Sequence, residues 1–398
     1  MLPTALRTIN EAYIQSKCWM TYGSFVGKWS EQTCDIDRDA ASFDFKRESW
    51  RYAHPRTFKN HLASRYRPED FQDAEGRWLT KCTDRLLVYH ALEWSGRDRV
   101  AYISTPLYFY REHAQNSYKT VATADKARQM AHIMAQPSKA CLESTIHVVM
   151  CCWERVHFLP KQLQSLNQQT LSGRLHLHLL NNNVRAISDM ERVVGSARPQ
   201  LHFPVTLRHY RNASFGFERF LYVRDHLMRQ ELLDYVVIVD DDQLFEKDWV
   251  ERLWNLRTPR TYLAWYCKAW DPSRSLDYWK GSLVTYTQCR RGLAMDKVMN
   301  YHYGGSGGSL VDAAIFLATS ALFRTSACAL PVLNIEDLWL SFIMTHCYGW
   351  SIRRSNVLPL IPSEGREALE SVALYKRLRP NKNALLRHLM VDLRWKLT

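Results

Sequence analysis

The sequence predicts an α/β protein in which residues 139–398 form a mostly parallel central sheet flanked by helices, preceded by a partial copy of a similar domain in residues 1–138. Three observations carry this prediction. Strand-like and helix-like segments alternate from residue 146 onward, and the run at 235–239 (YVVIV) is typical of a strand covered on both faces. One pattern of helix, glycine and strand also occurs twice along the chain. The length of 398 residues, which exceeds a typical single core, agrees with this division into two parts.

The strands and helices of the second part follow in order. Ile146–Cys152 (IHVVMCC) is predicted as a buried strand, and residues 158–169 as a helix with three leucines on one face. Residues 175–180 (LHLHLL) alternate leucine and histidine, which predicts a strand with one face in the core. His176 and His178 in this strand could be metal ligands, although solvent-facing or helix-facing side chains are the simpler interpretation.

Further along, residues 218–230 are predicted as a third helix and residues 235–239 as the central strand. Asp240, Asp241 and Asp242 follow that strand directly. In an extended chain, Asp240 and Asp242 point to one side and Asp241 to the other. Two carboxylates on one side can hold a hard divalent cation, and three adjacent like charges would repel each other without one. The alternative is a solvated turn or a helix N-cap.

The repeated pattern divides the chain into two unequal parts. In the first copy, Asp84 begins a helical run closed by a glycine (DRLLVYHALEWSG), and a strand-like segment (DRVAYIS) follows. In the second copy, Asp337 begins the corresponding helical run (DLWLSFIMTHCYG), and the strand-like segment WSIRRS follows. Between the two parts, near residues 122–144, a polar, helix-like stretch leads into the next strand and is typical of a linker. Residues 1–83 contain no buried strand that ends in carboxylates. We therefore expect residues 1–138 to be the back half of a similar domain, inactive because its other half is absent.

The composition indicates a globular protein, and the net charge indicates which partners it could bind. Apolar residues make up 46% and charged residues 23%, as in ordinary globular proteins. The net charge of +13 suits a nucleotide diphosphate, a nucleic acid or an anionic membrane surface. No Lys/Arg block resembles a nucleic-acid arm, so we expect no nucleic-acid partner, and a basic solvated surface is the simplest interpretation. Peripheral membrane contact stays open.

The ten cysteines and the N-terminal segment indicate where in the cell the protein is expected. The cysteines show no C-x-x-C spacing, so neither a zinc nor a redox site is indicated. Cys151 and Cys152 are adjacent in a buried strand, which suits reduced cysteines that pack in the core. The N-terminus has no apolar signal region, and no stretch of 18 apolar residues occurs. We expect a cytoplasmic protein.

The second part resembles the family-2-like glycosyltransferases of the nucleotide-diphospho-sugar transferase superfamily, which have the Rossmann-like A-type (GT-A) fold. The segment VVMCCWERVHFLPKQLQSLNQQT is similar to the opening of that family, and the matching residues are Arg155, Ser165, Leu166 and Gln169. The resemblance implies that Arg155 is among the donor-binding residues. In the family, the second strand usually ends in an acidic residue that holds the base. Here it ends in three asparagines, the first of which is Asn181, and asparagine can still bond a base edge.

The resemblance extends to the residues around the nucleotide. Residues 211–220 (RNASFGFERF) are similar to the Asn-x-x-x-Gly-x-x-x-Arg region, which implies that Gly216 allows close approach and that Arg219 reaches the phosphates. An ordinary loop with a surface arginine is the alternative. The resemblance places Asp240 at the ribose and the metal, Asp241 among the donor-binding residues, and Asp242 on Mn²⁺ or Mg²⁺.

A glycine-rich segment at 303–309 (YGGSGGS) resembles the one near the donor sugar in related transferases. The bare backbone at Gly305 and Gly307 would let the sugar approach closely. The alternative is a plain flexible turn. Asp312 follows and is a candidate for bonding a sugar hydroxyl.

Glu336 and Asp337 resemble the family's Glu-Asp pair beyond the acceptor site. Inverting transfer needs a general base for the acceptor hydroxyl, for which Asp337 is the first choice and Glu336 the second. Both acids also suit a helix N-terminus for dipolar reasons alone. Trp339 could form part of an acceptor floor, although a core position is the simpler interpretation.

The family's late histidine, which contacts the diphosphate or the metal, has no clear counterpart here. The possible substitutes are Arg377, Arg379 and Lys382. Residues 1–138 resemble the acceptor-side end of the same family, around the general base and beyond it.

Taken together, the residues and the resemblance imply transfer of a sugar from a nucleoside-diphosphate sugar to the hydroxyl of a glycan, lipid or protein acceptor. The reaction is expected to be metal-dependent and inverting. The alternative is an inactive carbohydrate- or nucleotide-binding relic of such an enzyme, for which the shortened first part and the missing histidine would speak.

Overall fold

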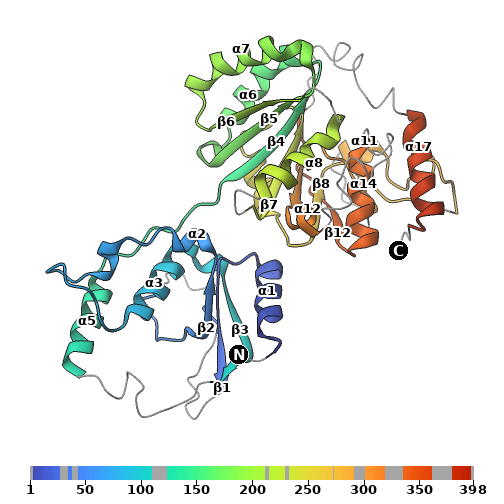
Figure 1. Ribbon diagram of the computed structural model, residues 1–398. Helices are drawn as coiled ribbons and strands as arrows, with labels where there is room; N and C mark the ends of the chain where they lie inside the picture. The colour runs from blue at the N-terminus through green and yellow to red at the C-terminus, as the bar shows by residue number, and fades with distance from the viewer. Residues whose placement is uncertain are drawn as a thin grey trace. The chain divides into compact units, whose positions relative to one another are not determined.

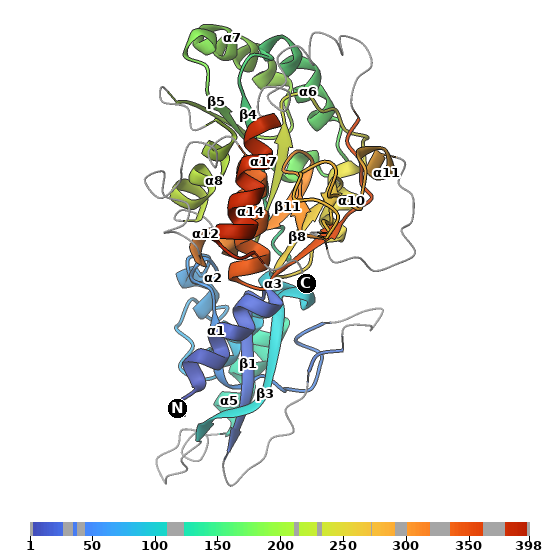
Figure 2. The ribbon, with the colours of Figure 1, turned by 90° about the vertical axis from the view of Figure 1, so that its right-hand side faces the viewer.

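The computed structural model describes residues 3–26, 35–37, 44–109, 123–210, 215–228, 233–271, 273–290, 301–318, 335–360 and 379–395. They belong to two compact units, Met1–Glu143 and Ser144–Thr398, which are described separately (Figures 1 and 2). Among the described residues, no helix combines the length and apolar character that crossing a membrane requires.

The second unit is built on a seven-stranded sheet with the order β12-β8-β11-β7-β4-β5-β6. Strand β11 runs antiparallel to β7 and β8, and every other neighbouring pair is parallel. The predicted α/β fold with a mostly parallel central sheet is therefore confirmed. The strands are β4 (Ile146–Cys152), β5 (Leu175–Asn181), β6 (Val205–His209), β7 (Tyr235–Asp240), β8 (Thr261–Ala264), β11 (Ser309–Asp312) and β12 (Ser351–Arg354), and a separate pair joins β9 (Cys267–Lys268) to β10 (Tyr303–Gly304).

Helices cover both faces of this sheet because the strands are apolar on both faces. In β4, Ile146, Val148 and Met150 belong to one apolar core, whereas Val149 and Cys151 belong to the other. The first core includes α6 (Leu159–Asn167), α7 (Ile187–Ala197) and α10 (Trp249–Asn255), and the second includes α8 (Glu218–Tyr222), α12 (Ala314–Ala318), α14 (Glu336–Phe342) and α17 (Arg379–Arg387). The short helix α11 (Tyr286–Arg290) packs near β9.

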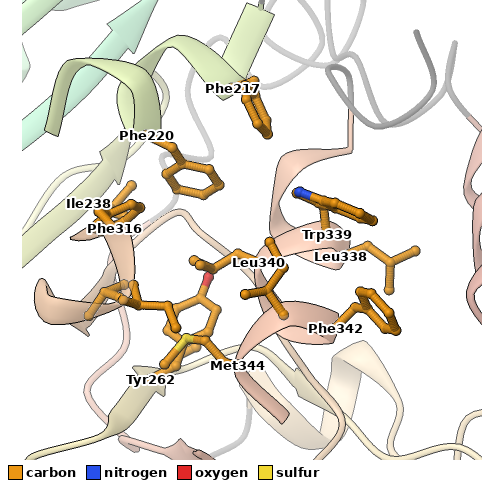
Figure 3. Close-up of a cluster of buried hydrophobic side chains, with 14 of the residues drawn as sticks. Phe217, Phe220, Ile238, Tyr262, Phe316, Leu338, Trp339, Leu340, Phe342 and Met344 are labelled. Atoms are coloured by element: carbon orange, nitrogen blue, oxygen red, sulfur yellow. The ribbon is translucent and has the colours of Figure 1, made fainter. Parts of the chain in front are cut away.

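The second core holds α8 and α14 against the sheet. Figure 3 shows Phe217 and Phe220 near Leu340 and Trp339, with Ile238 of β7 in the same cluster. Trp339 is 8% exposed and therefore belongs to the core, as the simpler interpretation had it. Both helices continue into a π-helical turn, over Val223–Leu227 and Ile343–Cys347.

Two expectations about this unit need adjustment. Strand β5 has both faces buried, not one, because α8 covers its histidine-bearing face, and His178 is 2% exposed. The helix expected over 218–230 is α8 followed by its π-helical turn. The eight described cysteines form no disulfide bond, and Cys151 and Cys152 face opposite cores, in line with their predicted packing role.

The first unit has a three-stranded sheet with the order β2-β1-β3. Strand β1 is antiparallel to β2 and parallel to β3, just as β8 is antiparallel to β11 and parallel to β12. Helix α3 precedes β3 as α14 precedes β12, so strand order and direction agree. An internal repeat would produce this agreement, and the origin of residues 1–138 stays a prediction. The elements are α1 (Ala5–Ser16), β1 (Met20–Val26), β2 (Ala53–Phe58), α2 (Asn60–Ala63), α3 (Thr83–Ser95), β3 (Val100–Phe109) and α5 (Thr123–Ala135).

Candidate active site

The predicted site residues gather at the carboxyl ends of β4, β5 and β7. Strand β4 lies between the other two, with Cys151 paired to Asp240 and Cys152 to Asn181. The chain leaves β4 toward β5 and β6 on one side and later returns to β7 on the other. Such a reversal of strand order is where open α/β sheets bind ligands.

Asp241 joins the end of β7 to the loop after β4. It is 7% exposed and accepts hydrogen bonds from the backbone N–H of Trp153 at 3.1 Å and from Nη1 of Arg155 at 2.5 Å. The same Nη1 lies 3.5 Å from Oδ2 of Asp242. Arg155 and Asp241, both predicted to bind the donor, are thus brought together, and their mutual ion pair fixes the loop.

Asp240 is held from the opposite side by Arg219 of α8. Nη1 of Arg219 lies 3.0 Å from Oδ1 of Asp240, and Nη2 lies 3.5 Å from Oε1 of Glu336 on α14. Nε donates to the carbonyl of Gly216 at 3.0 Å, and the residue is 6% exposed. Repulsion among the three aspartates is therefore relieved in part by two arginines, which the sequence analysis did not anticipate. Contact between Arg219 and a phosphate stays a prediction.

Two glycines make this close packing possible. A Cβ atom on Gly307 would lie 1.9 Å from Oδ2 of Asp240, and one on Gly216 would lie 2.1 Å from Oε1 of Glu336. The segment 303–309 is buried throughout, with Gly305 N donating to the carbonyl of Tyr266 at 2.8 Å. A plain flexible turn does not describe this segment.

Charge is unevenly balanced at the site. The side chains of Asp240 and Asp242 remain 37% and 33% exposed, so a ligand can reach them. Burial and the neighbouring charge of Asp240 raise the pKa of Asp242 to about 7. Burial also raises the pKa of Glu336 to about 7, although the charge of Arg219 acts in the opposite direction. Four carboxylates, those of Asp240, Asp241, Asp242 and Glu336, thus lie beside two arginines at the site.

Asp337 stands at the start of α14 and is half-buried. Its Oδ1 accepts the backbone N–H of Leu338 at 2.8 Å, and its Oδ2 accepts the hydroxyl of Tyr303. Ser341 connects this helix to the glycine-rich segment, because its Oγ donates to the carbonyl of Asp337 at 2.7 Å and accepts from Gly304 N at 3.1 Å. The predicted general base therefore has a fixed orientation.

Three residues that position the site were missed by sequence reasoning. Gln162 donates to the carbonyl of Asp240 at 2.9 Å, and Gln243 accepts the N–H of Asp240 at 3.1 Å. Tyr303 holds Asp337. The only available signals were that Gln243 directly follows the aspartates and that Tyr303 begins the glycine-rich segment.

Other predicted residues stand apart from these contacts. Asn181 is 1% exposed and bonds His209 Nδ1 at 3.0 Å and Asn183 N at 2.9 Å, so its contact with a base stays a prediction. Asp312 pairs with Tyr235 at the far end of β7 from Asp240, and its carboxylate caps backbone N–H groups. The expectation that Asp312 bonds a sugar hydroxyl is therefore wrong.

Only some of the basic residues proposed to replace the family's late histidine lie in the described part of the structure. Nζ of Lys382 lies 5.0 Å from the ring centroid of Tyr278. Arg379 begins α17, and its side chain lies outside the described part of the structure. Arg377 and residues 211–214 lie outside the described residues.

Comparison with known proteins identifies no family model and no similar curated protein. Three similar solved structures are glycosyltransferases. The mannosyltransferase PcManGT from Pyrobaculum calidifontis, in complex with GDP-Man and Mn²⁺, is 15% identical over 64% of this chain and 72% of that chain, with a TM-score of 0.40. TarS of S. aureus is 12% identical over 57% and 38% (TM-score 0.36), and the bifunctional WbbM is 13% identical over 62% and 49% (TM-score 0.33). The matches to TarS and WbbM span less than two thirds of those chains.

Proposed function

We propose that this chain transfers a sugar from a nucleoside-diphosphate sugar to an acceptor hydroxyl. The observation that carries the proposal is the pair of accessible carboxylates, Asp240 and Asp242, at the end of β7 beside the reversal of strand order. The sequence resemblance to glycosyltransferases gives this geometry its chemical meaning. The acceptor class, whether glycan, lipid or protein, belongs to the same proposal, as do contact with a membrane surface and the absence of a nucleic-acid partner.

The donor set suits Mn²⁺ or Mg²⁺, since both ions prefer carboxylate oxygens. Asp242 would be the main ligand, because its side chain is 33% exposed and the nearest described cationic group, Nη1 of Arg155, lies 3.5 Å from its Oδ2. Asp240 would be the second ligand or would contact the ribose. When bound, such an ion would neutralise charge on the departing diphosphate.

The proposed reaction is a single displacement. The acceptor oxygen forms a bond to C1 of the sugar, the bond from C1 to the diphosphate oxygen breaks, and the nucleoside diphosphate leaves with the electron pair. The acceptor proton passes to a carboxylate. Attack from the face opposite the diphosphate inverts the configuration at C1.

Asp337 is better placed than Glu336 to take that proton. Glu336 is 8% exposed and lies against Arg219, whereas Asp337 is more exposed and oriented by Tyr303. Glu336 would then act as a positioning residue for Arg219. A carboxylate that accepts a proton must be within reach of the acceptor hydroxyl, which favours the exposed one.

The test is turnover and binding of a panel of nucleotide sugars, with and without Mn²⁺, by the wild-type chain, Asp242→Ala and Asp248→Ala. Asp248 is the matched control, because its side chain is 47% exposed near the start of α10. We expect metal-dependent turnover of one donor that is lost in Asp242→Ala and kept in Asp248→Ala. Near-wild-type activity of Asp242→Ala would refute the metal assignment. Failure of every donor to bind would favour the inactive relic.

A further inference from the structure

Three histidines meet on the sheet face that α8 covers, away from the aspartates. His147 of β4 is paired with His176 of β5, and His178 follows two residues later on the same face. One ligand nitrogen from each ring lies within 4.8 Å of the others. The cluster is separate from the candidate active site, since His147 is paired with Val236, near the opposite end of β7 from Asp240.

Hydrogen bonds from the outside orient two of these rings. Nε2 of His176 bonds Oγ1 of Thr206 at 2.9 Å, and Nδ1 of His178 bonds the hydroxyl of Tyr222 at 2.9 Å. Metal-binding histidines commonly use one nitrogen in this way, which fixes the ring and directs the lone pair of the other nitrogen toward the ion. Here the second nitrogen of His178, Nε2, faces Nδ1 of His147 at 2.9 Å.

Burying this cluster costs free energy, because the imidazole rings lose their hydrogen bonds to water. His147 and His178 are each 2% exposed, on a sheet face otherwise lined with apolar side chains. Buried polar rings are tolerated only when their nitrogens are bonded. In this cluster the bonded nitrogens face Thr206, Tyr222 and the neighbouring ring.

We propose that His147, His176 and His178 bind one Zn²⁺ ion between β4, β5 and α8. Three imidazole nitrogens suit a borderline transition ion better than Mg²⁺ or Mn²⁺, and a water molecule would complete a tetrahedral set. Two nitrogens bound to such an ion are about 3.3 Å apart, so the 2.9 Å contact between His147 and His178 needs to open by only about 0.4 Å. In the zinc-bound form, the ion would take the place of the hydrogen bond between these two rings.

The site would brace the helix that carries Arg219. Tyr222, which bonds His178, lies on α8 less than one turn after Arg219. An ion held beneath α8 would therefore fix the helix against β4 and β5.

The experiment measures zinc binding in the Asp242→Asn chain, in which the carboxylate site is weakened and bound zinc reports on the histidines. Chelator-treated protein is titrated with Zn²⁺, and X-ray absorption at the zinc edge identifies the ligands. The test variant is His176→Gln, because His176 is the least buried of the three. The control is His202→Gln, which removes an exposed histidine of the same unit.

We expect one zinc ion per chain, three imidazole nitrogens at about 2.0 Å, and affinity reduced at least tenfold by His176→Gln but unchanged by His202→Gln. Absence of bound zinc in the folded chain, or equal affinity in His176→Gln, would overturn the proposal. If His176→Gln fails to fold, the X-ray absorption spectrum of the Asp242→Asn chain, which keeps all three histidines, shows whether they bind zinc. Because sugar transfer is assayed separately with Mn²⁺ in the wild-type chain, failure of either proposal leaves the other standing.

Discussion

Arg219 on α8 and Glu336 on α14 form an ion pair across the second core, with 3.5 Å between Nη2 and Oε1. Both residues are more than nine-tenths buried, and the same guanidinium also holds Asp240. One arginine thus links the two helices to the end of β7.

Removing this arginine should strongly destabilise the second unit. We expect Arg219→Met to lower the free energy of unfolding by about 3–5 kcal/mol, because two carboxylates lose their buried partner. Adding Glu336→Gln should restore about 1 kcal/mol or more, since one of those charges is then gone. Urea denaturation at pH 7 measures both effects. The control is Arg192→Met, which breaks an exposed ion pair with Asp189 and should change stability by less than about 0.5 kcal/mol. An equally small effect of Arg219→Met would show that the ion pair between Arg219 and Glu336 does not stabilise the fold.

A methyl group at Gly307 should disturb the metal site more than the fold. In Gly307→Ala, the new Cβ must displace the carboxylate of Asp240. We expect at least a tenfold loss of Mn²⁺-dependent turnover with a loss of stability of about 1–2 kcal/mol. Gly195→Ala is the control, because nothing lies within 4 Å of its Cβ on α7, and it should raise stability by about 0.5–1 kcal/mol. Unchanged metal dependence in Gly307→Ala would argue against Asp240 at the site.

The hydroxyl of Tyr303 should influence the rate more than substrate binding. Tyr303→Phe keeps the buried ring but removes the hydrogen bond to Asp337, so we expect kcat to fall about tenfold with little change in KM. Asp337→Asn should cost about 10²–10⁴ in kcat. Steady-state kinetics, with whichever donor the nucleotide-sugar panel identifies, provides the measurement. Tyr286→Phe, at a 45% exposed tyrosine, should behave as the wild type; a change confined to KM in Tyr303→Phe would contradict the positioning role.

Buried Lys268 should make stability depend on pH. The residue is 3% exposed, and burial and the nearby charge of Lys382 lower its pKa to about 8. Below pH 8 the folded chain therefore holds a charged lysine at a cost, and this cost disappears as pH rises toward the ordinary lysine pKa of about 10.4.

We accordingly expect Lys268→Met to stabilise the chain by about 2 kcal/mol at pH 7, with the advantage shrinking between about pH 8 and pH 10. Denaturation of both proteins across that range tests the sign. Lys247→Met, at an exposed lysine, should show no such trend. A constant difference between wild type and Lys268→Met would mean that Lys268 titrates normally in the folded chain.

Local patterns in the sequence were sufficient for much of the fold. Strands β4 and β7 could be predicted because an apolar run of the right length has few alternatives in an α/β chain. The aspartates could be placed because the carboxyl edge of such a sheet binds ligands. These inferences need only neighbouring residues.

Contacts between distant segments could not be predicted in the same way. The Arg219–Glu336 pair joins two helices whose relative position depends on core packing. His147 escaped notice because only the register of β4 against β5 brings it to His176 and His178. Asp312 was misplaced because nothing in its neighbourhood reveals that β11 runs antiparallel to β7.

The π-helical turns after α8 and α14 bear on how this chain should be aligned with distant relatives. A π-helical turn takes up about one residue more than an α-helical turn. One residue can therefore be lost within Val223–Leu227 or Ile343–Cys347 without moving Arg219, Glu336 or Asp337. Single-residue gaps in an alignment should fall inside these two turns, so a gap there carries no evidence against shared ancestry.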